Sequence, residues 1–135
     1  MSSVSDLSIL LHGLAPELHP GEFVYCTLDS TDVPATVEPV AAIREAEGLT
    51  LVLPRIQAEQ LGLGFSFPCA WITLTIHSNL EAVGLTPVVS KALAANGIAC
   101  NIIAGYYHDH LFVPFKHAER AMNTLISLAA GNEGR

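Results

Sequence analysis

The most regular hydrophobic pattern in the chain runs from Ala70 to Pro114. Apolar and polar residues alternate from Trp71 to Ile76, which is typical of a strand with one buried face. The apolar residues that follow fall at the spacing of one helix face: Leu85, Val88, Val89, Ala92 and Leu93. Two apolar runs, at 98–104 and 111–113, then predict a pair of strands.

The predicted helix has recognisable ends. Thr86 is a residue type that caps helices, and Pro87 follows at the first helical position, where its missing N–H removes no hydrogen bond. Asn96 and Gly97 predict the end of the helix, because glycine readily adopts the left-handed conformation found there. A second apolar stripe predicts a final helix: Ala118, Ala121, Met122, Leu125, Leu128 and Ala129. We therefore expect strand, helix, strand, strand, helix, with both helices on one face of an antiparallel sheet.

The first half of the chain shows weaker patterns. They predict strands at 23–28, 40–45 and 49–53 and short helices at 5–14 and 55–61. Pro16, Pro20 and Gly21 interrupt the chain before the first strand, and Glu47 and Gly48 form a turn. No strand precedes the first helix, so we expect the two halves, 1–68 and 69–135, to share or exchange a strand, with 70–76 as the candidate.

Three stretches carry a family resemblance: Glu47–Pro54, Trp71–Thr86 and Gly97–Pro114. The amino-acid sequences of these stretches resemble the ACT domain, a small ligand-binding regulatory module. They are most similar to small bacterial proteins built of two ACT-like units. The resemblance implies an α+β fold of two ferredoxin-like βαββα(β) units. Residues 69–135 would form the C-terminal ACT domain, and residues 1–68 a degenerate N-terminal half.

Composition narrows the class of protein. Half of the 135 residues are apolar and 14% are charged, which favours a folded chain with some apolar surface covered by another copy. We therefore expect a homo-oligomer, with the dimer as its simplest form. The net charge of −7, with only six Lys and Arg residues, argues against nucleic acid and anionic membranes as partners.

The chain also looks cytoplasmic. No run approaches the ~18 apolar residues of a membrane span, and the N-terminus lacks the basic and apolar regions of a secretion signal. Cys26, Cys69 and Cys100 are an odd set without CxxC spacing, which favours buried free thiols over a disulfide framework or a zinc site.

The segment His108-Asp109-His110 is the richest candidate for chemistry. Two histidines at i and i+2 on a strand face the same way and could share a metal with a third ligand such as His77. The alternative is a polar hairpin end between two strands, and we favour it. No GxSxG, HExxH or GxxxxGK[ST] motif occurs, and His77 and Ser78 point to opposite faces if both lie in a strand. We expect no enzymatic activity, no cofactor and no metal.

Ligand binding fits the residues better. The loop from His77 to Thr86 runs into a helix N-terminus, where free backbone N–H groups favour a carboxylate. In ACT domains the amino-acid effector usually sits between that loop and the second strand. The resemblance therefore implies a site made by Asn79, Leu80, Gly84, Leu85 and Thr86 on one side and Asn101 and Ile102 on the other. The alternative is that these residues serve only the turn, the helix cap and the strand edge.

These expectations combine into a regulatory protein that binds a small amino acid or related metabolite. With no catalytic domain in the sequence, it would act on an enzyme in trans or change its own assembly. Two other readings stay open. One is a structural ACT module without ligand, and the other is a metal-dependent enzyme using His108, Asp109 and His110.

Overall fold

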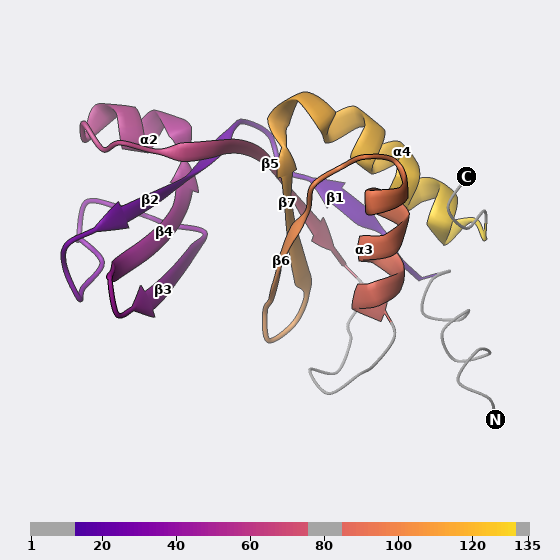
Figure 1. Ribbon diagram of the computed structural model, residues 1–135, viewed down its shortest axis with the longest axis horizontal. Coiled ribbons are helices and arrows are strands. Elements are labelled where there is room, and N and C mark those ends of the chain that lie inside the picture. Colours follow the sequence, from indigo (N-terminus) through magenta and orange to yellow (C-terminus); the bar gives the residue numbers. More distant parts are fainter. Residues whose placement is uncertain (1–12, 76–84, 132–135) are drawn as a thin grey trace. The chain divides into compact units, whose positions relative to one another are not determined.

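The computed structural model describes residues 13–75 and 85–131 and is of the α+β class (Figure 1). It has two compact units. The terminal unit joins the N-terminal segment up to His19 with the chain from Ala70 onward, and the central unit is Pro20–Cys69. The two units are described separately below. No helix of the described residues is long and apolar enough to cross a membrane.

The central unit is an antiparallel sheet with one short helix. Its elements are β2 (Phe23–Leu28), β3 (Ala41–Glu45), β4 (Gly48–Pro54), α2 (Arg55–Gln60) and the first part of β5 (Ser66–Leu74). Strand β4 pairs with both β2 and β3. Alternation along β4 puts Leu49, Leu51 and Leu53 into a core that also receives Ala58 from α2. The predicted strand at 23–28 is confirmed.

A glycine fixes the hairpin between β3 and β4. The turn residues are Ala46 and Glu47, one position earlier than predicted, and Gly48 opens β4 opposite Glu45. Gly48 has a φ of 156°, and a Cβ added there would lie 2.8 Å from the carbonyl oxygen of Leu28. The close approach of the neighbouring strand therefore requires a residue without a side chain.

Strand β5 contributes to both units. In the central unit it pairs with β2, where the register shifts between Phe23 and Tyr25. Phe67 lies at this irregularity with a φ of 53°, and its ring meets that of Tyr25 edge-on at 5.7 Å. In the terminal unit the same strand pairs with β1 (Pro16–Leu18), over Ile72 to Leu74. This sharing is what the missing strand of the first half led us to expect.

The terminal unit packs two helices on one core. Besides β1 and the rest of β5, it holds α3 (Leu85–Ala95), β6 (Asn101–Ala104), β7 (Asp109–Pro114), η1 (Phe115–His117) and α4 (Ala118–Ala129) (Figure 1). Both predicted helical stripes are confirmed, because α3 buries Leu85, Val89, Ala92 and Leu93 while α4 buries Ala121, Leu125 and Leu128. These side chains share one hydrophobic cluster with Ala70, Ile72 and Leu74 of β5.

The C-terminus of α3 follows the predicted glycine stop. Gly97 has a φ of 71°, and its N–H donates to the carbonyl of Ala94 while the N–H of Ile98 donates to that of Leu93. This pair of bonds is a Schellman motif, and the burial of Ile98 and Leu93 supplies its hydrophobic contact.

Other element ends differ from the prediction. Helix α3 begins at Leu85, so Thr86 lies in its first turn instead of capping it; Leu85 is drawn inward because its side chain belongs to the core. Strand β1 occupies a stretch that the prolines predicted to be broken chain. Its partner β5 lies far away in sequence, and local residue preferences do not report such pairing.

Candidate functional site

The residues predicted for the ligand site belong to the segment before α3, to the start of α3 and to β6. Asn79, Leu80 and Gly84 fall outside the described residues. Leu85, the first residue of α3, is 3% exposed and belongs to the hydrophobic core, whereas Thr86 is exposed to solvent. A ligand at this loop would therefore meet the backbone and side chain of Thr86 before the side chain of Leu85.

Asn101 and Ile102 open strand β6. Ile102 packs against the core of the terminal unit, on the side of the helices, and Asn101 is exposed. Successive strand residues point to opposite faces, so the Asn101 amide points away from the side that the helices cover. The structure thus brings Leu85 and Ile102 to one core and leaves Thr86 and Asn101 at the surface.

The start of α3 is suited to an anion. The helix is 11 residues long and has no acidic side chain in its first turn. The first backbone N–H groups of a helix lack intrahelical acceptors, and its dipole is positive at this end. No described carboxylate within that turn competes with a bound carboxylate for these donors.

The His108-Asp109-His110 segment is a hairpin end. The N–H of Gly105 donates to the carbonyl of His108, and Tyr106 and Tyr107 between them are exposed. Strand β7 begins at Asp109, which pairs with Ala104 of β6. Within residues 13–75 and 85–131, no group of three or more His, Cys, Asp or Glu side chains is placed to hold a metal ion.

A polar and aromatic cluster lies on the face of β5 opposite to the core. Thr73, 5% exposed, has its hydroxyl oxygen 2.7 Å from Nε2 of His19 and 3.1 Å from Nδ1 of His110. The indole N–H of Trp71 donates to the same Nδ1 atom at 3.1 Å. The rings of His19 and Trp71 are stacked, with centroids 3.5 Å apart. We call these four residues the His19–His110 cluster.

Burial sets the titration of both imidazoles. Burial lowers the pKa of His110, and the charges of His108 and His19 lower it further. The charge of Asp109 raises this pKa but does not outweigh the other effects. Burial likewise lowers the pKa of His19, against the raising effect of Glu17. Gly105 leaves room for the His110 ring, since a Cβ at that position would lie 3.2 Å from Nε2. Both histidines are therefore held toward the neutral form.

Sequence reasoning missed the His19–His110 cluster. Alternation in β5 did predict that Trp71 and Thr73 share a face, and His110 was noticed for its spacing from His108. Nothing local connects them to His19, which reaches Thr73 across 54 residues of sequence. The pairing of β1 with β5 creates this contact.

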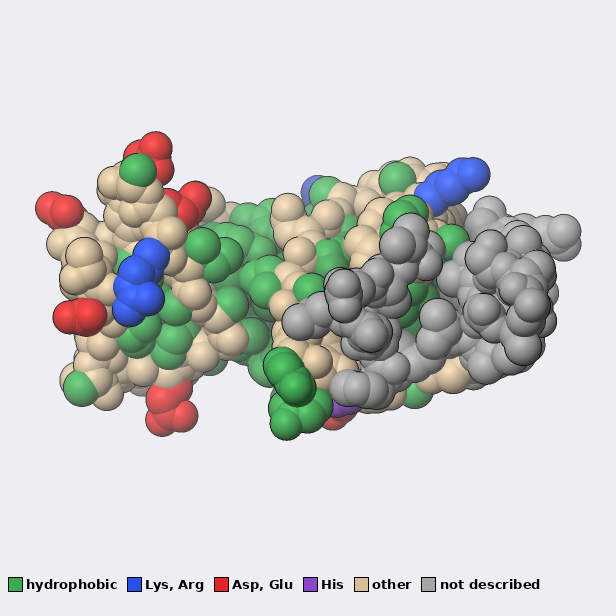
Figure 2. Space-filling model, turned by 90° about the horizontal axis from the view of Figure 1, so that it is seen from below, with side chains coloured by type: hydrophobic (Ala, Val, Ile, Leu, Met, Phe, Trp, Pro, Cys, Tyr) green, Lys and Arg blue, Asp and Glu red, His purple; other side chains and the backbone are tan. Residues whose placement is uncertain are grey.

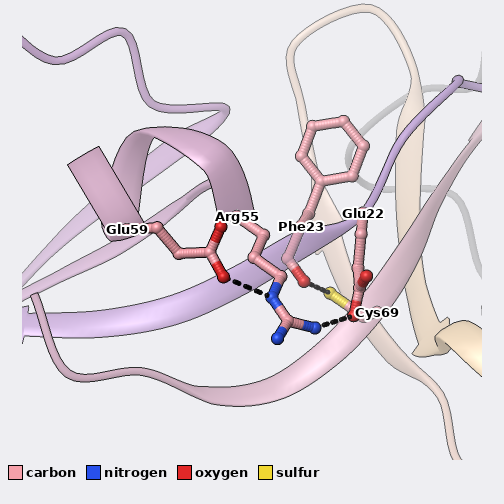
Figure 3. A network of polar contacts seen from close by, with 5 residues as sticks. All are labelled: Glu22, Phe23, Arg55, Glu59 and Cys69. Atoms are coloured by element: carbon pink, nitrogen blue, oxygen red, sulfur yellow. Dashed lines mark hydrogen bonds and ion pairs between the residues drawn. The ribbon is translucent and has the colours of Figure 1, made fainter.

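The central unit has an open cleft of about 510 Å³ beside Arg55. The Arg55 guanidinium lies between two carboxylates (Figure 3). Its nitrogens are 2.9 Å from an oxygen of Glu22 and 3.2 Å from an oxygen of Glu59. The hydrogen bond with Glu22 raises the pKa of Arg55, and the ring of Phe65 lies 5.1 Å from its guanidinium carbon. Figure 2 shows further acidic side chains on the surface of this unit. Arg55 thus ties the start of β2 to α2, and the cleft has no uncompensated cation to offer an anionic ligand.

Comparison with protein families identifies the fold. Two models, both described as ACT domain, match residues 2–70 and 66–127. The chain belongs to the ACT domain family. The two ACT matches overlap at 66–70, within β5, the strand that contributes to both units. The resemblance noted from the sequence, with two ACT units in tandem, is therefore confirmed.

Solved structures agree with this assignment. A protein of unknown function from Vibrio cholerae, described as a possible transport protein, is 45% identical over 95% of this chain and 99% of its own, with a TM-score of 0.84. A protein from Agrobacterium tumefaciens is 20% identical over 86% of this chain and 89% of its own, with a TM-score of 0.69. No curated protein gives a significant match.

The ACT fold also relates the chain to a regulatory subunit. The regulatory subunit of aspartate kinase from Thermus thermophilus, in its ligand-free form, is 10% identical over 86% of this chain and 98% of its own, with a TM-score of 0.58. At this identity the likeness concerns the fold. The two ACT-domain matches suggest a regulatory, ligand-binding role.

Proposed function

We propose that this ACT-domain protein is a non-enzymatic regulator that binds a small amino acid or a related metabolite. The observation that supports it most is the match of ACT models to nearly the whole chain, at 2–70 and 66–127. The fold shared with a regulatory subunit of aspartate kinase points the same way. We assign the ligand to the C-terminal ACT half, residues 69–135, and a degenerate, supporting role to residues 1–68.

The proposed site uses the loop that leads into α3. The ligand carboxylate would bind backbone N–H groups between Asn79 and Thr86, near the positive end of the helix dipole. The exposed amide of Asn101 would approach from β6 and bind the amine or carboxylate. The loop residues Leu80 and Gly84 would complete the site, and the buried Leu85 and half-buried Ile102 would support it from the core.

The proposed setting is a cytoplasmic homodimer that regulates an enzyme in trans. Strand β6 ends the strand order of the terminal unit, so its outer edge offers backbone groups for pairing with a second copy. The three cysteines are free thiols, as expected in a reducing compartment. Regulation would follow if the ligand changed this assembly or the surface presented to the enzyme.

A thermal-shift screen tests the proposal. The full-length protein would be heated with each of the twenty amino acids; a ligand at about 100 times its Kd adds roughly 2.7 kcal/mol of apparent stability. Calorimetry with each hit would then be repeated on three variants. Asn101→Ala and Gly84→Leu should weaken binding at least about tenfold, while Asn123→Ala, an exposed asparagine on α4, should bind like the wild type.

The outcomes separate the readings. No shift and no heat with any amino acid at millimolar concentration would favour a structural ACT module instead. Binding that survives both Asn101→Ala and Gly84→Leu would place the ligand elsewhere on the protein. A stoichiometric transition metal in protein purified without added metal would support the metal-dependent enzyme.

A further inference from the structure

We propose that His19, Trp71, Thr73 and His110 form a pH-sensitive latch, in which protonation of His110 loosens β1 from β5. The inference does not depend on the proposed ligand. It rests on three observations. The Thr73 hydroxyl contacts both His19 and His110, Nδ1 of His110 accepts from both Thr73 and Trp71, and the His19 ring stacks on Trp71.

The hydrogen bonds define the protonation state of His110. An indole N–H can only donate, so Nδ1 of His110 must carry a free lone pair to accept it from Trp71. His110 is therefore neutral, with its proton on Nε2. Because this Nδ1 atom carries no proton, the Thr73 hydroxyl donates to His110, and its oxygen accepts from Nε2 of His19.

Protonation of His110 cannot be accommodated in this arrangement. A proton on Nδ1 would face the Trp71 N–H at a nitrogen–nitrogen distance of 3.1 Å, with two donors opposed and no acceptor between them. The new N–H can donate to the hydroxyl oxygen of Thr73, which then no longer donates to His110, and Trp71 loses its bond to His110. The indole must then move, and its ring is the surface on which His19 stacks.

The consequence falls on β1 because the strand is short and its C-terminal end is joined to β5 at the cluster, while Ala15 before it bonds to Thr75 and the strand also contacts α4. The strand has three residues, Pro16 to Leu18, and a buried anchor before it at Leu14. Its far end is held to β5 by the His19 N–H, which donates to the Trp71 carbonyl at 2.9 Å, and by the ring contacts described above. His19 is also the last residue before the chain leaves the terminal unit, and Trp71 is the second residue after it returns.

The charges around the cluster act on this equilibrium in opposite directions. Among the described residues, His108 and His19 repel a proton on His110, Asp109 attracts it, and Glu17 attracts one on His19. Burial outweighs the carboxylates, and both histidines have lowered pKa values. Opening returns His110 to its ordinary pKa. The closed latch is therefore fully stable above about pH 6.5 and weakens as the pH falls toward the lowered value.

Acid titration of the full-length protein tests the latch. Trp71 is the chain's only tryptophan, so its fluorescence reports on the cluster directly. Amide hydrogen exchange reports on the strand pair through the His19 N–H, bonded to Trp71, and the Thr75 N–H, bonded to Ala15. Between about pH 7.5 and pH 5, the protection factors of both amides should fall by at most about tenfold per pH unit, and the emission should change in parallel.

His110→Asn is the decisive variant. The asparagine amide oxygen can occupy the place of Nδ1 and accept from Trp71, but it does not titrate. Both signals should then stay constant over this pH range. His117→Asn is the matched control, because His117 is a histidine of the same unit outside the cluster, and this variant should behave like the wild type.

Three results would overturn the latch. The first is a wild-type protein whose amide protection and tryptophan emission stay constant between about pH 7.5 and pH 5. The second is a His110→Asn variant that keeps the pH dependence of the wild type. If the variant fails to fold, NMR titration of the wild-type His110 ring decides the matter. Its midpoint must coincide with the loss of His19 and Thr75 protection, and a separate midpoint would contradict the proposal.

Discussion

Pro54 and Pro114 occupy equivalent positions in the two units. Each is the last residue of a strand and directly precedes a helical turn, with φ and ψ of −56° and 136° at Pro54 and −51° and 135° at Pro114. Neither helix has a side-chain cap bond. The proline ring restricts φ, so the chain passes from strand to helix in the same way twice. This repetition is the local counterpart of the tandem ACT architecture.

Gly97 should be sensitive to any side chain. Because its φ is 71°, Gly97→Ala should lower the free energy of unfolding by about 1–2 kcal/mol, the cost of left-handed backbone for an L-residue. Gly97→Asn should cost less, since asparagine tolerates this conformation. Urea denaturation of the three proteins measures the difference, and an alanine variant as stable as the wild type would contradict the Schellman assignment.

Gly48 should be sensitive to substitution for a different reason, because the neighbouring strand leaves no space for a side chain. Gly48→Ala places a Cβ 2.8 Å from the Leu28 carbonyl oxygen and should destabilise the protein by about 1–3 kcal/mol. Gly64→Ala is the matched control, because nothing lies within 4 Å of a Cβ there. Chemical denaturation should show Gly64→Ala unchanged or slightly more stable. Equal losses in both variants would show that the close strand contact is not the cause.

Neighbouring residues of α4 should respond very differently to truncation. Leu125 is fully buried, so Leu125→Ala should cost about 2–4 kcal/mol through lost transfer energy and the cavity left behind. Ile126 is 53% exposed, and Ile126→Ala should stay within about 0.5 kcal/mol of the wild type. Thermal unfolding of both variants checks this contrast. Similar losses would mean that Ile126 is covered in solution, for example by a second copy.

The thiols of the folded protein should react slowly. Burial raises the pKa of Cys69 to about 12 and that of Cys100 to about 11, and it also raises the pKa of Cys26. At pH 8 the thiolate fraction of Cys69 would be about one in ten thousand. A chromogenic disulfide reagent should therefore release colour slowly from native protein and promptly in denaturant, with glutathione as the reference thiol. Prompt reaction of the native protein would contradict this picture.

Light scattering should find a mass near twice 14.3 kDa at micromolar concentration. If association uses the outer edge of β6, Ala104→Lys on that strand should shift the protein toward the monomer. Asn123→Lys, on the exposed side of α4, is the control and should leave the mass unchanged. A monomeric wild type would refute self-association, and a dimeric Ala104→Lys variant would move the contact away from β6.

The residues predicted for the ligand site were those with a local signature in the sequence. The loop before α3 was chosen for its glycine, its helix start and its family resemblance, and Asn101 as a polar residue between apolar ones. The sequence did not indicate the direction in which these side chains point. Whether Leu85 faces a ligand or the core depends on how α3 packs, and the structure shows it in the core.

The sequence alone determined the elements whose pattern is written in consecutive residues. The strand-forming residues of β2, the apolar stripe of α4 and the glycine at position 97 act over a few residues, so local residue preference and periodicity were sufficient to predict these elements. The tertiary structure decided the contacts between distant segments. Strand β1 exists because β5 pairs with it, and Thr73 joins residues 54 positions before it and 37 after it. Such contacts depend on how the chain returns upon itself, and no run of neighbouring residues records that path.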